Sequence, residues 1–234
     1  MDKKQRIQSI DALRGLAVVL MVAHHFLFDL YAFLDAPRWL FYNPVFDVLH
    51  HIFTVVFIGL SGVSSRFSRS NIRRGVIVLA IALAMSLVTW FMYMPIRFGV
   101  LHLLGISMIF YGITHKMWES IPDKLMPVLC VALIILSLLA VNCIHIDSEH
   151  LWMFGWYTED FYSADYFPIF PWLFVFLFGT WAGKHIRDGH LPEKFYTFNM
   201  PIFPQIGRKA LIIYIIHQPI LFGITMIIKY VFFR

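Results

Sequence analysis

The sequence predicts an all-α fold, a polytopic membrane helix bundle of about seven transmembrane helices. Composition is the first reason, because 59% of the 234 residues are hydrophobic and only 14% are charged, against about 25% charged in soluble domains. Mean hydropathy is +0.71. The second reason is a series of seven apolar runs, and the third is that basic residues gather in alternate loops. These observations exclude a soluble enzyme, a disordered chain and a disulfide scaffold.

The seven apolar runs are each long enough to cross a bilayer, at roughly 20 residues per span, although the fourth and sixth are short. The first run is too long for a cleavable signal peptide and is expected to remain as a signal anchor. Because neither a repeat nor a linker divides the chain, residues 1–234 are expected to form a single transmembrane domain. The runs cover residues 15–34, 48–64, 75–94, 98–114, 125–143, 169–183 and 210–232.

Orientation follows from the basic residues, which favour the cytoplasmic side. Arg38, Arg97, Lys229 and Arg234 fall on one side if there are seven spans. The opposite side carries many more basic residues, so we expect that side to be cytoplasmic, with the N-terminus in the cytoplasm and the C-terminus outside. Its basic residues are Lys3, Lys4, Arg6, Arg14, Arg66, Arg69, Arg73, Arg74, Lys116, Lys124, Lys184, Arg187, Lys194, Arg208 and Lys209.

The basic pI of 9.2 is therefore explained by topology, and nucleic-acid binding is not expected. The long outer segment, Ile144–Pro168, contains five acidic residues and neither Lys nor Arg. It is also rich in aromatic side chains. These predict an interfacial aromatic belt, with a sugar-stacking surface as the alternative.

Ionisable side chains inside a span are costly, so each is a candidate functional residue. A histidine near a helix end is also often an interfacial residue or a satisfied core group, and that alternative stays open for each one. Four histidine-bearing spans in one small bundle favour function for the set as a whole. The candidates are His24, His25 and Asp29 in the first span, His50 and His51 in the second, Arg97 and His102 at the fourth, and His217 and Gln218 in the seventh.

The first span carries the sharpest pattern, because His25 and Asp29 are four residues apart and share a helix face. A carboxylate one turn away can fix the tautomer of an imidazole and stabilise its protonated form. Adjacent histidines such as His24 and His25 point to different faces and do not readily bind one ion. Since HExxH and CxxC spacings are also missing from the sequence, we expect no metal.

Two groups near the cytoplasmic side are candidates for binding a phosphorylated donor. The first is the loop between the second and third spans, with Arg66, Arg73 and Arg74 among serines. Its arginines anchor the topology, clamp phosphates, or do both. The second is the pair Asp11 and Arg14, which are neighbours on one helical turn.

Five segments resemble, in order, the bacterial relatives of the heparan-α-glucosaminide N-acetyltransferase catalytic domain. The resemblance covers nearly the whole chain. In the broader acyltransferase-three membrane family, an Arg-Gly pair precedes a histidine, and Arg14 and His25 reproduce that spacing of eleven residues. The segments read RIQSIDALRGLAVVLMVAHHFLFDL, FIGLSGVSSRF, IRFGVLHLLGIS, YFPIFPWLFVFLFGTWAG and IGRKALIIYIIHQPI.

The resemblance implies a bacterial inner-membrane enzyme that passes an acetyl group from cytoplasmic acetyl-CoA to an outer acceptor, such as an amino sugar or another glycan. His25 matches the catalytic histidine, as general base or transient acyl carrier, and Asp29 would orient it. His102 matches a recurring family histidine and is the third expected catalytic residue. The expected donor-binding residues are Asp11, Arg14, Arg66, Arg73 and Arg74. The residues expected to line the substrate cavity are His24, His50, His51, His217 and Gln218.

The alternative function is a non-enzymatic transporter or proton-linked channel that uses the same histidines as a relay. Transporters often contain inverted repeats or helices broken at matching positions, and the sequence has neither. The expected partners are the lipid bilayer and a small-molecule or glycan acceptor, and a homo-oligomer stays open.

Overall fold

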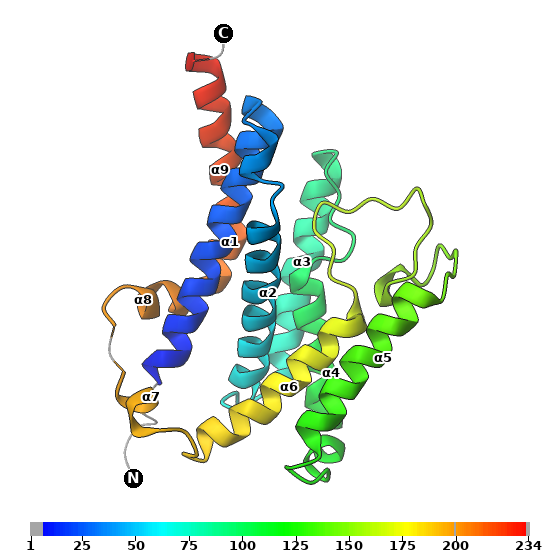
Figure 1. Ribbon diagram of the computed structural model, residues 1–234, viewed down its shortest axis with the longest axis vertical. Coiled ribbons are helices and arrows are strands. Elements are labelled where there is room, and N and C mark those ends of the chain that lie inside the picture. Colours follow the sequence, from blue (N-terminus) through cyan, green and yellow to red (C-terminus); the bar gives the residue numbers. More distant parts are fainter. Residues whose placement is uncertain (1–6, 199, 233–234) are drawn as a thin grey trace. The chain divides into compact units, whose positions relative to one another are not determined.

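The computed structural model describes residues 7–198 and 200–232 (Figure 1). The structure is 74% helical, and its described residues form no β-strand. The only strand-like pairing among them is one isolated bridge between Phe98 and Tyr166. The predicted all-α fold is confirmed. Of the basic residues used to orient the chain, Lys3, Lys4, Arg6 and Arg234 lie outside the described residues.

Seven helical segments are long and apolar enough to cross a membrane, as the sequence predicted. Several extend past the apolar runs into polar residues, because hydropathy detects the lipid-facing part of a helix whereas backbone hydrogen bonding continues into the interface. Ser70, for example, caps the third span by accepting from the Arg73 amide at 3.2 Å. The segments are Gln8–Leu34, Arg38–Ser65, Asn71–Phe91, Val100–Glu119, Met126–Cys143, Ile169–Arg187 and Ala210–Phe232.

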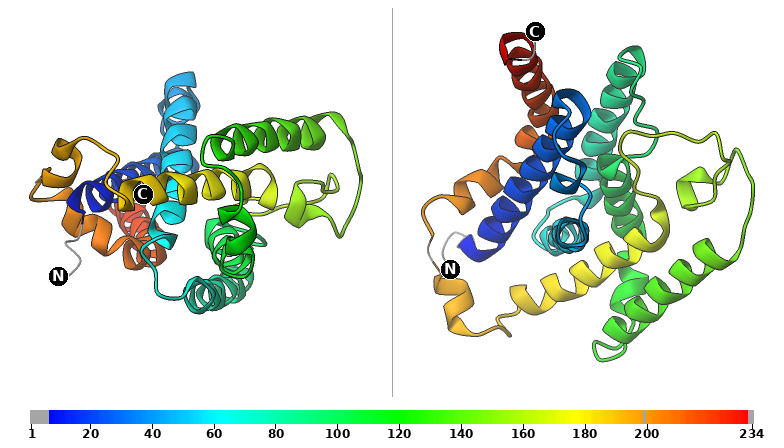
Figure 2. Two further views of the ribbon diagram at one scale, coloured as in Figure 1. Left: turned by 90° about the horizontal axis from the view of Figure 1, so that it is seen from below. Right: turned by 45° about the horizontal axis from the view of Figure 1, so that its top comes forward.

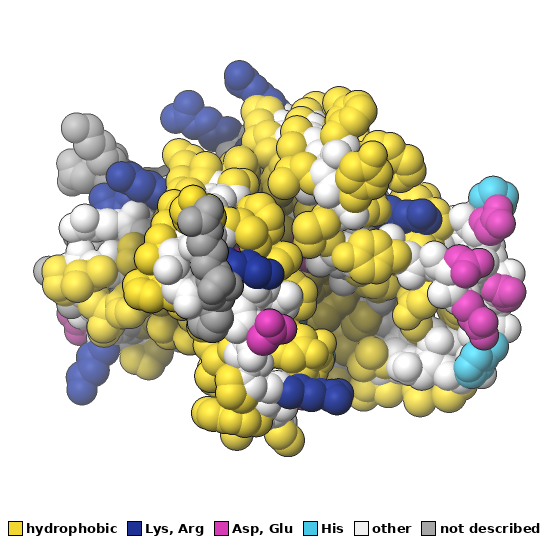
Figure 3. Space-filling model, turned by 90° about the horizontal axis from the view of Figure 1, so that it is seen from above, with side chains coloured by type: hydrophobic (Ala, Val, Ile, Leu, Met, Phe, Trp, Pro, Cys, Tyr) yellow, Lys and Arg dark blue, Asp and Glu magenta, His cyan; other side chains and the backbone are white. Residues whose placement is uncertain are grey.

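The surfaces of these helices are apolar. In the third span only 11% of the most hydrophobic 18-residue window is buried, and Leu83 and Leu87 are among its exposed side chains. Figure 3 shows hydrophobic side chains over most of the face that it views. A soluble protein rarely exposes so much continuous apolar surface, so the chain is a multi-pass membrane protein.

The chain folds as two compact units, one comprising residues up to Phe57 together with those from Leu191 onward, and the other Ile58–His190. The single-domain organisation expected from the sequence stays a prediction. The first unit contains α1 (Gln8–Leu34), the 3₁₀ turn η1 (Arg38–Leu40), the start of α2 (Pro44–Ser65), α7 (Glu193–Thr197), α8 (Phe203–Arg208) and α9 (Ala210–Phe232). The second contains the end of α2, α3 (Asn71–Phe91), α4 (Val100–Glu119), α5 (Met126–Cys143), η2 (Trp152–Phe154) and α6 (Ile169–Arg187).

In the first unit, α1 packs along α9 and against the short helix α8 (Figure 2). Two glycines allow the backbones of α1 and α8 to touch. A Cβ atom on Gly15 would lie 2.0 Å from the Phe203 carbonyl oxygen, and one on Gly207 would lie 1.8 Å from that of Asp11. Small residues at such crossings are typical of membrane helix packing. This contact fixes the first turn of α1, and α9 holds the rest of the helix.

In the second unit, α3 packs against α4 and α5 against α6. Glycines again permit the closest approaches. A Cβ on Gly75 of α3 would lie 2.7 Å from the Gly105 carbonyl oxygen, and one on Gly62 of α2 would lie 2.0 Å from that of Phe176 on α6. The helices of this unit therefore approach closely at glycines, and large buried side chains such as Phe176 and Leu103 fill the rest of its core.

Candidate active site

The first unit brings together six of the polar residues that the sequence singled out. They come from α1, α2 and α9 and form two groups along α1. Between α1 and α9, the His25 ring contacts the His217 ring, and Gln218 is hydrogen-bonded to Asp29. His24 contacts His50 and two aromatic residues between α1 and the η1–α2 segment.

Asp29 is fully buried, and the hydrogen bond that the structure gives it comes from α9. The Gln218 amide nitrogen donates to Oδ1 of Asp29 at 2.9 Å. The expectation from sequence was that Asp29 would orient His25, one turn earlier on the same helix. That role stays a prediction, whereas the bond to Gln218, 189 residues away, was not foreseen.

His217 lies beside His25, with their ring centroids 4.9 Å apart. Nδ1 of His217 is 2.7 Å from the backbone carbonyl oxygen of Tyr214. A carbonyl only accepts hydrogen bonds, so Nδ1 carries the proton, and Nε2 of the neutral ring carries the lone pair. A lone pair at Nε2 is what a general base requires.

Pro219 follows this pair within α9. A proline has no backbone N–H, so the carbonyl of Ile215, four residues earlier, lacks its usual helical donor. Neighbouring Tyr214 uses its carbonyl to hold the His217 ring. The HQP segment thus places a carbonyl without its helical donor close in sequence to two polar side chains that contact α1.

Several polar atoms in this part of the first unit are buried without a hydrogen-bond partner among the described residues. They are Oδ2 of Asp29, Nε2 of His217, Oε1 of Gln218 and Nδ1 of His50. Buried polar atoms in proteins are nearly always paired, and each exception calls for an explanation such as a bound group. These four atoms lie on residues that sequence analysis placed in the site, and four further unpaired atoms among the described residues belong to Ser68, Asn71, Ser107 and Thr225.

The second group surrounds His24. Its ring centroid is 4.3 Å from that of His50 and 4.9 Å from that of Phe41. His51 is exposed, and its Nδ1 contacts the Asp47 carbonyl oxygen at 2.7 Å. In the described part of the chain, no group of three or more His, Cys, Asp or Glu side chains could hold a metal ion.

His102 belongs to the second unit and stands at the start of α4. The Gly99 amide donates to its Nδ1 at 3.2 Å, so Nε2 carries the proton and faces the Ser86 hydroxyl oxygen at 3.2 Å. Both ring nitrogens are therefore engaged, and the ring also stacks on Phe98. The structure gives His102 a place in the N-terminal cap of α4, and its catalytic role stays a prediction.

The expected donor-binding residues differ in how far they are engaged. Arg14 pairs with Asp11 at 3.3 Å. Arg66 is held on three sides, by the Glu119 carboxylate, by the Thr180 carbonyl oxygen at 3.0 Å and by the Tyr111 ring.

Arg73 and Arg74 are exposed on the first turn of α3. The Arg74 guanidinium donates to the Ser64 carbonyl oxygen at 3.3 Å. Beside this region, the Lys184 ammonium donates to Asp123 and lowers the pKa of that exposed carboxyl. Of the donor-binding candidates, Arg73 and Arg74 present the most open cationic surface.

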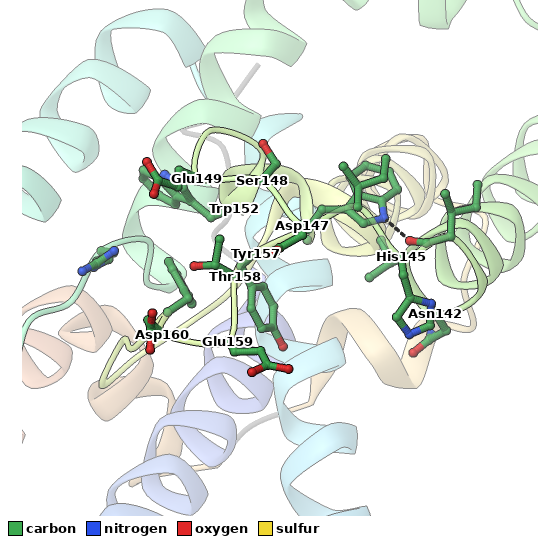
Figure 4. A pocket seen from close by; sticks show the side chains of 17 residues that line it. Asn142, His145, Asp147, Ser148, Glu149, Trp152, Tyr157, Thr158, Glu159 and Asp160 are labelled. Atoms are coloured by element: carbon green, nitrogen blue, oxygen red, sulfur yellow. Dashed lines mark hydrogen bonds between the residues drawn. The ribbon is translucent and has the colours of Figure 1, made fainter.

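In the second unit, residues of the segment 144–168 and their neighbours line an open cavity of about 1000 Å³ (Figure 4). Acidic side chains line it together with aromatic ones, and Figure 3 shows acidic groups gathered on one part of the face that it views. The Arg97 guanidinium lies over the Phe161 ring at 5.3 Å. Burial raises the pKa of Tyr166, whose hydroxyl donates to the Trp152 carbonyl oxygen at 2.6 Å. The labelled lining residues include Asp147, Glu149, Trp152, Tyr157, Glu159 and Asp160.

Comparison with known families gives one result. The model of the family described as "Heparan-alpha-glucosaminide N-acetyltransferase, catalytic" matches residues 6–219. No curated protein and no solved structure matches the chain. The matched residues include α1 and the His217–Gln218 pair of α9, and therefore the whole polar cluster between them. The chain belongs to the heparan-α-glucosaminide N-acetyltransferase catalytic-domain family.

Proposed function

We propose that the protein is a membrane acetyltransferase that passes an acetyl group from cytoplasmic acetyl-CoA to an amino sugar or another glycan at the outer face of a bacterial inner membrane. The family suggests acetyl transfer with acetyl-CoA as donor. The observation that carries the proposal is the buried cluster of His25, Asp29, His217 and Gln218 within one unit. Each unpaired buried polar atom costs about 1–3 kcal/mol, and a substrate group bound beside this cluster would supply the missing hydrogen bonds.

His25 acts as the general base in this proposal. It removes a proton from the acceptor amine or hydroxyl as the new bond to the acetyl carbon forms. The C–S bond of the thioester breaks, and its electron pair leaves on the CoA sulfur, which then takes up the proton. Asp29, one turn further along α1, supports the positive imidazole. Transient transfer of the acetyl group to His25 itself is the variant of this scheme that the sequence left open.

The donor binds from the cytoplasmic side, where the exposed Arg73 and Arg74 pair with the phosphates of CoA. Arginine forks suit phosphate oxygens. The cavity lined by residues of the segment 144–168 offers acidic and aromatic side chains, which suit the hydroxyls and apolar faces of a sugar.

The test is transfer by the purified, detergent-solubilised protein supplied with acetyl-CoA and glucosamine. Release of free CoA thiol and formation of N-acetylglucosamine are the expected products. The test variant is His25→Ala, and its matched control is His24→Ala. The two residues are adjacent on α1, but His25 is the one whose ring lies beside His217. A folded wild-type protein that neither transfers nor hydrolyses acetyl-CoA would contradict the proposal and favour the transporter alternative.

A further inference from the structure

Three of the unpaired atoms in the cluster are alike in chemistry. Oδ2 of Asp29 belongs to a carboxylate. Nε2 of His217 bears a lone pair because its Nδ1 proton is held by Tyr214. The Gln218 amide nitrogen faces Asp29, which leaves its oxygen, Oε1, as the unpaired atom. All three are therefore hydrogen-bond acceptors, and they belong to residues that are adjacent in sequence or joined by a hydrogen bond.

A set of three buried acceptors that includes a carboxylate matches one common group, a primary ammonium, which has three N–H donors and a positive charge. We propose that the reacting ammonium of the acceptor binds between α1 and α9, where it donates to Asp29, Gln218 and His217, and that His217 removes its first proton. The inference rests on the proposed function with an amine as acceptor.

An ammonium must lose two protons to become an amide nitrogen, and His25 takes only one of them. His217 takes the other. An ammonium cannot attack a thioester, because its nitrogen has no free electron pair. One proton must move to Nε2 of His217 before attack. The second leaves as the C–N bond forms and the C–S bond breaks, and it passes through His25 to the CoA sulfur. His217 then returns the first proton to solvent. One acetyl-CoA and one R–NH₃⁺ thus give one R–NH–acetyl, one CoA thiol and one released proton.

The contacts around the pair support this division. The ring centroids of His25 and His217 lie 4.9 Å apart, so the two imidazoles are direct neighbours. The bond between Gln218 and Asp29 ties α9 to α1 one residue after His217 and one turn after His25. In the proposed complex, a nitrogen that donates to Nε2 of His217 is therefore also near the His25 ring.

The experiment compares two reactions of the purified protein, acetyl transfer to glucosamine and hydrolysis of acetyl-CoA by water. Water is uncharged and has no ammonium proton to lose, so His217 matters less for hydrolysis. We expect His217→Gln to lower the turnover number for glucosamine by about 10²–10⁴-fold and hydrolysis by a smaller factor. Thr225→Val is the matched control, since Thr225 is also buried on α9, and it should keep transfer within about twofold of wild type.

Added imidazole separates a chemical role from a structural one. We expect it to restore part of the glucosamine transfer in His217→Gly and none in Thr225→Val, which has lost no base. Equal losses in both reactions, wild-type transfer in His217→Gln, or a folded His217→Gly protein that imidazole does not restore would each overturn the inference. Failure of the wild-type protein in both reactions would instead overturn the proposed function.

Discussion

The contact between α1 and α8 predicts a steep penalty for a single methyl group at Gly207. An alanine Cβ there would lie 1.8 Å from the Asp11 carbonyl oxygen, and that distance must grow to about 3.0 Å to be tolerated. Both sides of the contact are backbone, so no side chain can rotate away. Overpacking of this kind costs about 1–3 kcal/mol, and replacing a helical glycine by alanine returns roughly 0.5–1 kcal/mol.

Gly207→Ala should therefore destabilise the protein by a net amount of up to about 2.5 kcal/mol, which for a chain of this size corresponds to a midpoint lower by up to roughly 10 °C. The assay is thermal unfolding of the detergent-solubilised protein, followed by circular dichroism. Gly223→Ala on α9 is the matched control, because nothing lies within 4 Å of its Cβ position, and its midpoint should stay level or rise. A Gly207→Ala midpoint equal to or above that of Gly223→Ala would refute the argument from backbone contact.

Three further predictions concern chemistry and topology. His25→Ala should lower acetyl transfer by at least about 10²-fold and Asp29→Asn by less, measured as turnover with equally folded protein; the reverse order would refute the assignment of the base. Replacing Arg73 and Arg74 with Gln should raise the Michaelis constant for acetyl-CoA more than that for the acceptor, and an unchanged constant would leave them as topology anchors. Single cysteines introduced in residues 144–168 should react with impermeant reagents only from outside, and labelling from the cytoplasm would reverse the predicted orientation.

Sequence alone predicted the seven spans because hydropathy is a local property that each apolar run carries by itself. It did not predict α7 and α8, which lie in the polar connection before the last span. Their short lengths give no periodic signal, and the packing of α8 depends on Gly15, nearly 200 residues earlier. The sequence shows where the glycines are, but it does not show which of them lie against the backbone of another helix.

Sequence analysis singled out the polar residues that the structure brings together along α1, but it did not predict which of them are hydrogen-bonded to each other. Helical spacing joined Asp29 to His25, since a pattern four residues apart is visible in one segment. The bond from Gln218 connects the first and last spans, and no local rule indicates which of two distant helices are neighbours. The hydrogen bonds of His102 to Gly99 and Ser86 were also not predicted, because they depend on backbone geometry at the start of α4 that residue type does not encode.

The long sequence separation of the Asp29–Gln218 bond has a consequence for biosynthesis. Gln218 leaves the ribosome 189 residues after Asp29, which at common elongation rates is a delay of roughly 9–38 s. During that time the first span is already in the translocation machinery with a carboxyl group that lacks its amide donor. The nascent first helix must therefore keep Asp29 near water, protein or a proton source until α9 arrives. Completion of the polar cluster is then among the last events of assembly, and a chain stalled before the seventh span would carry an unpaired acidic group that quality-control proteases could recognise.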